Sequence, residues 1–93
     1  MARDRDYLGR VASIGCIVCS DLGYQDTPAE IHHLREGQGM SQRASHYLAI
    51  PLCATHHRTG GKGVALHAGQ REFEALYGTE LDLLARTIER MSA

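Results

Sequence analysis

The apolar residues near the amino terminus follow a helical pattern. In residues 4–14 they recur at intervals of three and four, at Tyr7, Leu8, Val11 and Ala12. This spacing gathers them on one face of a helix, and Gly15 favours the end of that helix. We therefore expect a short amphipathic helix that leads directly into Cys16.

Two apolar runs in the middle of the chain predict a pair of strands. Residues 29–34 (AEIHHL) and 46–52 (HYLAIPL) have the length and composition of strands, and Pro51 favours the end of the second run. The connection between them, residues 35–45 (REGQGMSQRAS), is rich in Gly, Ser and Gln. The two runs are expected to pair as a long hairpin.

Helical spacing returns in the last third of the chain. Residues 54–59 can form one or two helical turns, and residues 66–77 predict a longer helix that Gly78 closes. Thr79 followed by Asp82 resembles a capping box for one more helix. The apolar stripe expected on that last helix, as packing surface in the core or at a subunit contact, consists of Leu81, Leu84, Ala85 and Ile88.

The length of 93 residues favours one domain with a small core. Small domains commonly add disulfides, a structural metal or a partner subunit to such a core. The composition, 43% apolar and 23% charged, is typical of a soluble globular protein, and no apolar run reaches the roughly 20 residues of a membrane helix. No secretory signal is visible at the amino terminus, so we expect a cytoplasmic location.

The formal net charge of −1 does not by itself indicate a polyanionic partner. Arginine nevertheless supplies nine of the ten basic residues, and its planar head donates several hydrogen bonds to phosphate. Four basic residues lie in the middle of the chain, at Arg35, Arg43, Arg58 and Lys62. They are either solvated surface charges or contacts for nucleic acid.

Three cysteines and one histidine have the spacing of zinc ligands. Cys16 and Cys19 form a CxxC pair, and Cys53 and His56 form a CxxH pair. Three cysteines cannot all pair in disulfides. Zinc prefers tetrahedral sulfur and nitrogen ligands held in pairs by tight turns, so the pattern predicts a structural zinc that contributes to folding. The alternative is that buried thiols and a surface histidine fall in this order by chance.

The chain contains more histidines than this zinc site uses. The others are His32, His33, His46, His57 and His67. Neighbours on a helical turn project about 100° apart, so His56 can face the zinc while His57 faces a separate cleft. Because a neutral imidazole can bind a metal or accept a proton near neutral pH, a second, histidine-based site is expected.

The order of these motifs resembles that of the HNH nucleases, and most closely their phage recombination-enhancement (Ref-like) branch. CIVC, EIHHL, IPLCATHH and ALHAGQREFEALYG follow one another in residues 16–78. In that family a hairpin and the following helix hold one divalent metal, and a zinc knuckle can brace them. The resemblance implies an α+β fold, with residues 1–93 as a single HNH-type nuclease domain. Its ββα-metal (His-Me finger) core would span about 16–78, its C-terminal helix about 79–91, with further helices flanking the core.

The resemblance also implies roles for the second site. His33 matches the histidine that acts as general base, and His32 matches the metal ligand before it, which is often an acid in relatives. His57 matches the metal-binding histidine of the helix, next to the zinc ligand His56. His67 resembles a later histidine that could complete the metal site.

Two features depart from the family pattern. The middle Asn of the HNH motif has no clear counterpart, so a backbone carbonyl or His46, which lies near that position with Tyr47, would have to orient the base. Neighbours on a regular strand also point to opposite faces. His32 and His33 can therefore face one cleft only if the strand ends or bulges there.

Together these patterns favour a metal-dependent DNA endonuclease. Hydrolysis of a phosphodiester needs a base for the attacking water and a cation for the charge on the transition state. The residues expected to act are His33 as base, His32, His57 and His67 as ligands of the catalytic metal, and Arg35, Arg43, Arg58 and Lys62 as contacts for DNA. Histidine ligands accept Zn²⁺, Ni²⁺ or Mn²⁺, whereas the family often uses Mg²⁺ or Mn²⁺, so the identity of this metal stays open.

The alternative is a noncatalytic, zinc-stabilised DNA-binding or recombination accessory module, in which the extra histidines are structural. A chain this short leaves little room for independent target recognition. Dimerisation through Leu81, Leu84 and Ile88, or delivery by a recruiting protein, would supply it. If a phage or prophage encodes the chain, the protein would act in the cytoplasm of the bacterial host.

Overall fold

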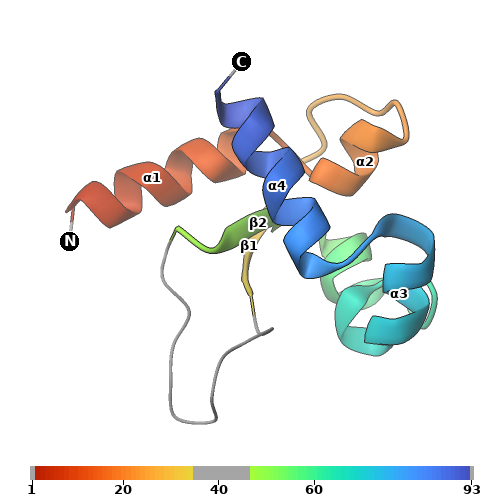
Figure 1. The fold of residues 1–93 in the computed structure, drawn as a ribbon. Helices are drawn as coiled ribbons and strands as arrows, with labels where there is room; N and C mark the ends of the chain where they lie inside the picture. Colours follow the sequence, from red (N-terminus) through yellow and green to blue (C-terminus); the bar gives the residue numbers. More distant parts are fainter. Residues whose placement is uncertain (1, 35–46, 93) are drawn as a thin grey trace, which may run out of the picture.

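A two-stranded antiparallel hairpin lies at the centre of the fold in the computed structural model, which describes residues 2–34 and 47–92 (Figure 1). β1 (Glu30–His33) pairs with β2 (Ala49–Leu52), from Glu30 opposite Leu52 to His33 opposite Ala49. All four residues of β2 are buried. The predicted hairpin is confirmed, and its second strand begins at Ala49.

Helices and short helical turns pack around the hairpin, which makes the fold α+β as expected. They are α1 (Ala2–Ser13), α2 (Ile17–Asp21), the π-helical turn η1 (Thr55–Thr59), the 3₁₀ turn η2 (Leu66–Ala68), α3 (Gln70–Tyr77) and α4 (Glu80–Met91). Figure 1 shows α4 above the hairpin, with α1 on one side and α2 and α3 on the other. Both α1 and α4 contact β2. None of the described helices is long and apolar enough to cross a membrane.

The core is one cluster that includes Ile50 and Leu52 of β2. Its buried members are Cys16, Ile17, Val18, Cys19, Leu34, Ile50, Leu52, Cys53, Leu66, Phe73, Leu83 and Leu84. The cluster draws on helices, a strand and turns between Cys16 and Leu84. All three cysteines belong to it, so their sulfurs lie in largely apolar surroundings.

The buried face of α4 differs from the predicted stripe. It consists of Glu80, Leu83, Leu84 and Thr87. Leu81 and Ile88 are 54% and 48% exposed, and Ala85 is exposed as well. As part of the core, the predicted stripe was therefore wrong except at Leu84, and its alternative role as a subunit contact stays a prediction. It counted apolar residues only, whereas two of the four positions that face the core are polar.

The other helix boundaries follow local signals with small changes. α2 was not predicted and begins inside the CxxC turn, directly after Cys16. Gly69 divides the predicted helix 66–77 into η2 and α3. Gly78 closes α3 as predicted, with a positive φ of 108° that favours glycine.

Candidate metal centres

Three cysteines and one histidine come together from two turns of the chain. Nδ1 of His56 lies 3.2 Å from Sγ of Cys53, 3.5 Å from Sγ of Cys19 and 3.8 Å from Sγ of Cys16, and the Cys19 and Cys53 sulfurs are 3.8 Å apart. Tetrahedral zinc bonds of about 2.3 Å to sulfur and 2.0–2.1 Å to nitrogen separate two sulfurs by about 3.8 Å and a sulfur from a nitrogen by about 3.6 Å. The predicted ligand set therefore forms a cluster that fits a structural zinc.

The same local contact holds both halves of this cluster. The Cys19 N–H donates to Cys16 Sγ at 3.4 Å, and the His56 N–H donates to Cys53 Sγ at 3.5 Å. Burial raises the pKa of the Cys16 thiol to about 12, so a thiolate here needs a cation beside it, which zinc would supply. Burial also lowers the pKa of His56, which favours the neutral imidazole that binds metals.

Three further histidines meet at a second point, next to the hairpin. His32 lies on β1, His57 on η1 and His67 on η2. Nε2 of His57 is 3.2 Å from Nδ1 of His32 and 3.0 Å from Nε2 of His67. A tetrahedral metal with bonds of about 2.05 Å would separate its nitrogen ligands by about 3.3 Å. These residues, called here the three-histidine group, could hold a metal ion.

Carboxylates contact two of these rings from the outside. Nδ1 of His57 is 2.8 Å from Oε1 of Glu30, and Nε2 of His32 is 2.5 Å from Oε2 of Glu80. Because an ionised carboxylate only accepts hydrogen bonds, the nitrogen beside it carries the proton, and the other nitrogen of a neutral ring has a lone pair. The lone pairs of His32 and His57 then face each other. Such an arrangement is repulsive unless a cation or a proton lies between them.

The electrostatics of the site favour this arrangement of protons. Burial is the largest influence on His32 and lowers its pKa, although Glu80 acts in the opposite direction, so the ring is neutral near pH 7. Hydrogen bonds from Arg58 and then from His57 lower the pKa of Glu30 to about 2, so this carboxylate is ionised. Both observations fit rings that present lone pairs to a metal.

His33 does not belong to the three-histidine group. It is the half-buried last residue of β1, and its pairing with Ala49 is regular. The ladder continues beyond it, where the Leu34 N–H donates to the Leu48 carbonyl. The strand therefore neither bulges nor ends between His32 and His33, and alternation turns His33 to the face opposite that of Glu30 and His32.

Two of the four basic candidates for DNA contact are described. Arg58 is 56% exposed and donates through Nε and Nη2 to both oxygens of Glu30, at 2.6–3.2 Å. Lys62 is 72% exposed, with Nζ 3.7 Å from Oε2 of Glu72. Both side chains remain accessible from solvent. Arg35, Arg43 and His46 lie outside the described residues.

Glu30 and Glu80 were missed by the sequence reasoning. Glu30 precedes His32 by two positions on the same strand, and the period of two could have placed both on one face. Glu80 has no comparable signal, because it is 48 positions from His32 along the chain. It sits in the first turn of a helix, where an acidic residue is common for reasons of helix stability alone.

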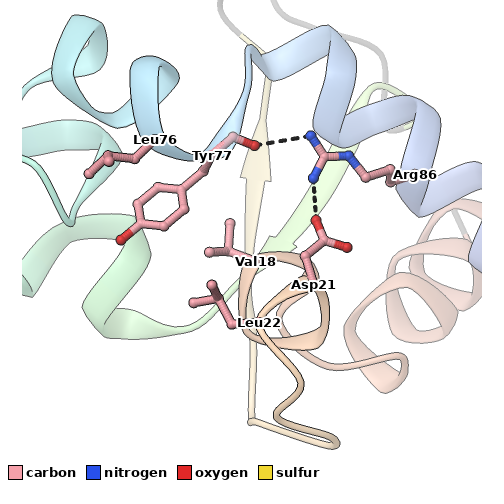
Figure 2. Close-up of a pocket in the computed structure, with 6 residues that line it drawn as sticks. All are labelled: Val18, Asp21, Leu22, Leu76, Tyr77 and Arg86. Atoms are coloured by element: carbon pink, nitrogen blue, oxygen red, sulfur yellow. Dashed lines mark hydrogen bonds and ion pairs between the residues drawn. The ribbon is translucent and has the colours of Figure 1, made fainter.

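An open pocket of about 230 Å³ is lined by residues outside both metal groups (Figure 2). Its lining consists of Val18, Asp21, Leu22, Leu76, Tyr77 and Arg86. Arg86 donates to the Asp21 carboxylate and, at 3.0 Å, to the Tyr77 carbonyl. These contacts join α2, α3 and α4. The one carboxylate in this lining, that of Asp21, is paired with Arg86, and the lining contains no histidine or cysteine.

Comparison with known families bears on almost the whole chain. Residues 1–92 match the model of the family described as "Recombination enhancement, RecA-dependent nuclease". The matched range contains both groups of candidate metal ligands. No curated protein matches the sequence.

Proposed function

Because this chain belongs to the recombination enhancement, RecA-dependent nuclease family, we propose that it is a metal-dependent endonuclease of the HNH type, which hydrolyses phosphodiester bonds in DNA. The observation that carries the proposal is the convergence of His32, His57 and His67 at one point. Two of these rings are held by carboxylates so that unprotonated nitrogens face each other. A site built this way favours a cation.

The order of the elements supports the HNH type. The ligand His32 comes from the first strand of a hairpin, and His57 comes from the helical turn directly after the second strand. His56 belongs to that same turn, Cys53 lies two residues before it, and both belong to the cysteine cluster. A structural zinc would therefore fix the turn that carries His57, which is the part that a zinc knuckle plays in the family.

A divalent metal at the three-histidine group would supply positive charge to the phosphate oxygens and the leaving oxygen, which gain negative charge as the bond to phosphorus breaks. Three protein ligands leave room for the substrate, as is usual for catalytic sites. The rings of His32 and His57 keep their orientation through Glu80 and Glu30 while the scissile phosphate enters. Mg²⁺, Mn²⁺ and Zn²⁺ are all candidates for this position.

We assign the general base to His33. A neutral imidazole can take the proton of the attacking water near pH 7, a contribution typically on the order of 10²- to 10⁴-fold. The strand turns His33 away from the three-histidine group. This role therefore requires the attacking water to lie at the end of β1, where His33 stands.

The substrate proposed for this site is DNA. Arg58 and Lys62 are exposed close in sequence to His57, and with Arg35 and Arg43 they would contact backbone phosphates. The description of the family names RecA, so we infer that cleavage is directed to DNA on which RecA is bound. Recruitment by RecA would supply the target recognition for which this short chain has little room.

The test is a cleavage assay on plasmid and single-stranded DNA with Mg²⁺ or Mn²⁺, with and without RecA. We expect cleavage by the wild type and a loss of at least about 100-fold in His33→Ala and in His57→Ala. His57→Ala should also take up one metal fewer, while His33→Ala keeps the wild-type metal content. The exposed Gln25→Ala serves as the control that retains activity.

Two results would contradict the proposal. Full activity in His33→Ala would remove the assignment of the base. DNA binding without cleavage, under every divalent ion and with RecA present, would favour a noncatalytic accessory module.

A further inference from the structure

Glu80 is a carboxylate in an unusual environment. It is the first residue of α4 and 0% exposed, whereas acidic residues are almost never fully buried unless they are paired. Removing a carboxylate from water is costly, and only close hydrogen bonds and charge interactions offset that cost. Oε2 of Glu80 lies 2.5 Å from Nε2 of His32, whose side chain is itself 3% exposed. A buried acid thus lies directly behind one member of the three-histidine group.

The start of α4 fixes the position of this acid. The Thr79 hydroxyl accepts from the Asp82 N–H at 3.1 Å, and the Asp82 carboxylate accepts from the Thr79 N–H at 2.9 Å, so the predicted capping box is present. Leu83 and Leu84 bury the same face of the helix in the core. Glu80 therefore reaches His32 from a capped and packed helix rather than from a loop, and the helix amino terminus favours its negative charge.

The contact selects one nitrogen of His32. Either ring nitrogen of a histidine can bind a metal, and a hydrogen bond at one nitrogen decides which remains available. Glu80 accepts at Nε2, so Nδ1 is left with a lone pair 3.2 Å from Nε2 of His57. Without the carboxylate the ring could take the other tautomer or rotate, and its nitrogen would no longer point to the other two rings.

We propose that Glu80 is a positioning residue of the metal centre, which holds the His32 ring and leaves Nδ1 as the nitrogen that binds the metal. Glu30 stands in the same relation to His57, at 2.8 Å, but it is shared with Arg58 and partly exposed. Glu80 is fully buried, so water cannot easily replace it. The proposal rests on the metal centre described under the proposed function, and it is independent of DNA cleavage.

The test compares metal binding in Glu80→Gln, Glu89→Gln and the wild type. Each protein is first loaded with one zinc at the cysteine cluster, and Co²⁺ is then titrated calorimetrically. Glu80→Gln keeps the shape of the side chain without its charge, and we expect its Co²⁺ affinity to fall about 10- to 100-fold. Glu89→Gln removes a carboxylate from an exposed position of the same helix, and its Co²⁺ affinity should stay at the wild-type value. Thermal unfolding checks that both variants are folded.

A second measurement needs no variant. In the wild type with one zinc, ¹⁵N spectra of the histidine side chains should show His32 as the Nε2–H tautomer. An Nδ1–H tautomer, an unchanged Co²⁺ affinity in Glu80→Gln, or a wild type that binds no Co²⁺ beyond the zinc would each overturn the proposal. If Glu80→Gln does not fold, the tautomer of the wild type decides. A protein that behaves as expected but cleaves no DNA would leave the role of Glu80 standing and remove only the nuclease.

Discussion

The ring of Tyr77 lies edge-on against the imidazole of His56, with ring centroids 5.2 Å apart and planes at 74°. Tyr77 ends α3, and its ring also packs on Phe73 in the core, with centroids 4.9 Å apart. His56 is therefore joined to Phe73 in the core through an aromatic side chain. Removal of this ring should weaken the packing around both.

We expect Tyr77→Ala to lower the free energy of unfolding by about 2 kcal/mol, because it deletes two aromatic contacts and part of a buried ring. Tyr77→Phe keeps the ring and should stay within about 0.5 kcal/mol of the wild type. Urea unfolding of the zinc-loaded proteins measures both. Equal stability of Tyr77→Ala and the wild type would mean that the contact with His56 contributes nothing.

The cysteine cluster is expected to decide whether the chain folds at all. Structural zinc in small domains contributes about 10–16 kcal/mol of apparent binding energy, which is comparable to the whole stability of a domain. Cys53→Ser should therefore lose zinc and the folded far-UV circular dichroism spectrum, and chelation of the wild type should have the same effect until zinc is returned. A Cys53→Ser variant that stays folded without zinc would show that these residues are ordinary buried thiols.

Two glycines should respond to alanine in opposite ways. A methyl group at Gly60 would lie 2.5 Å from the Thr55 carbonyl oxygen and 2.6 Å from Cγ1 of Val64, too close for either, in the turn that carries His56 and His57. We expect Gly60→Ala to destabilise the protein by about 1–3 kcal/mol. Gly9 is exposed within α1 with nothing near the added carbon, so Gly9→Ala should stabilise by about 0.4–1 kcal/mol.

Thermal unfolding of Gly60→Ala and Gly9→Ala beside the wild type distinguishes the two effects. The expectation fails if Gly60→Ala unfolds at or above the wild-type temperature. Metal content should be measured in the same samples, because a shifted turn would weaken zinc binding as well.

The capping carboxylate of α4 makes a pH-dependent contribution to stability. Hydrogen bonds from the Thr79 backbone and hydroxyl, and then the nearby Arg86, lower the pKa of Asp82 below its ordinary 3.8. A carboxyl group whose pKa is lower in the folded state than in the unfolded state stabilises the fold at pH values above the unfolded-state pKa. This stabilisation is lost as the pH falls through the folded-state pKa. The stability difference between the wild type and Asp82→Asn should thus be constant from pH 8 to about 5 and shrink below about 4.

Urea unfolding at each pH measures this difference. Excess zinc keeps both proteins loaded as the pH falls, so that the comparison reports the capping carboxylate and not the release of zinc. A difference that grows as the pH falls below 4 would contradict the assignment.

The parts of the site that could be predicted from spacing have ligands that are close in sequence. The spacing of Cys16 with Cys19, and of Cys53 with His56, predicts their geometry, because one tight turn places both members of a pair. The hairpin was likewise visible as two apolar runs. The histidines of the second group were recognised through a resemblance to a family and not through their spacing, since no local rule joins His32 to His67.

The contacts that were not predicted are set by packing between distant elements. Glu80 lies behind His32 only because α4 crosses the hairpin, and no pattern within residues 79–91 records that crossing. The same crossing determines the buried face of α4. Glu80 and Thr87 lie on that face, whereas Leu81 and Ile88, which hydrophobicity alone would place there, are exposed. A pattern of apolar residues does not predict a polar residue that is buried because it contacts a polar partner in the core.

One feature of η1 connects the cysteine cluster with the three-histidine group. His56 belongs to one and His57 to the other, so a single peptide unit separates them, and the hydrogen bond from the His57 N–H to the Cys53 carbonyl at 2.8 Å ties this unit back to the cysteine turn. A disturbance at the cysteine cluster would therefore reach His57 through this peptide, so the geometry of the three-histidine group depends on the cluster beside it.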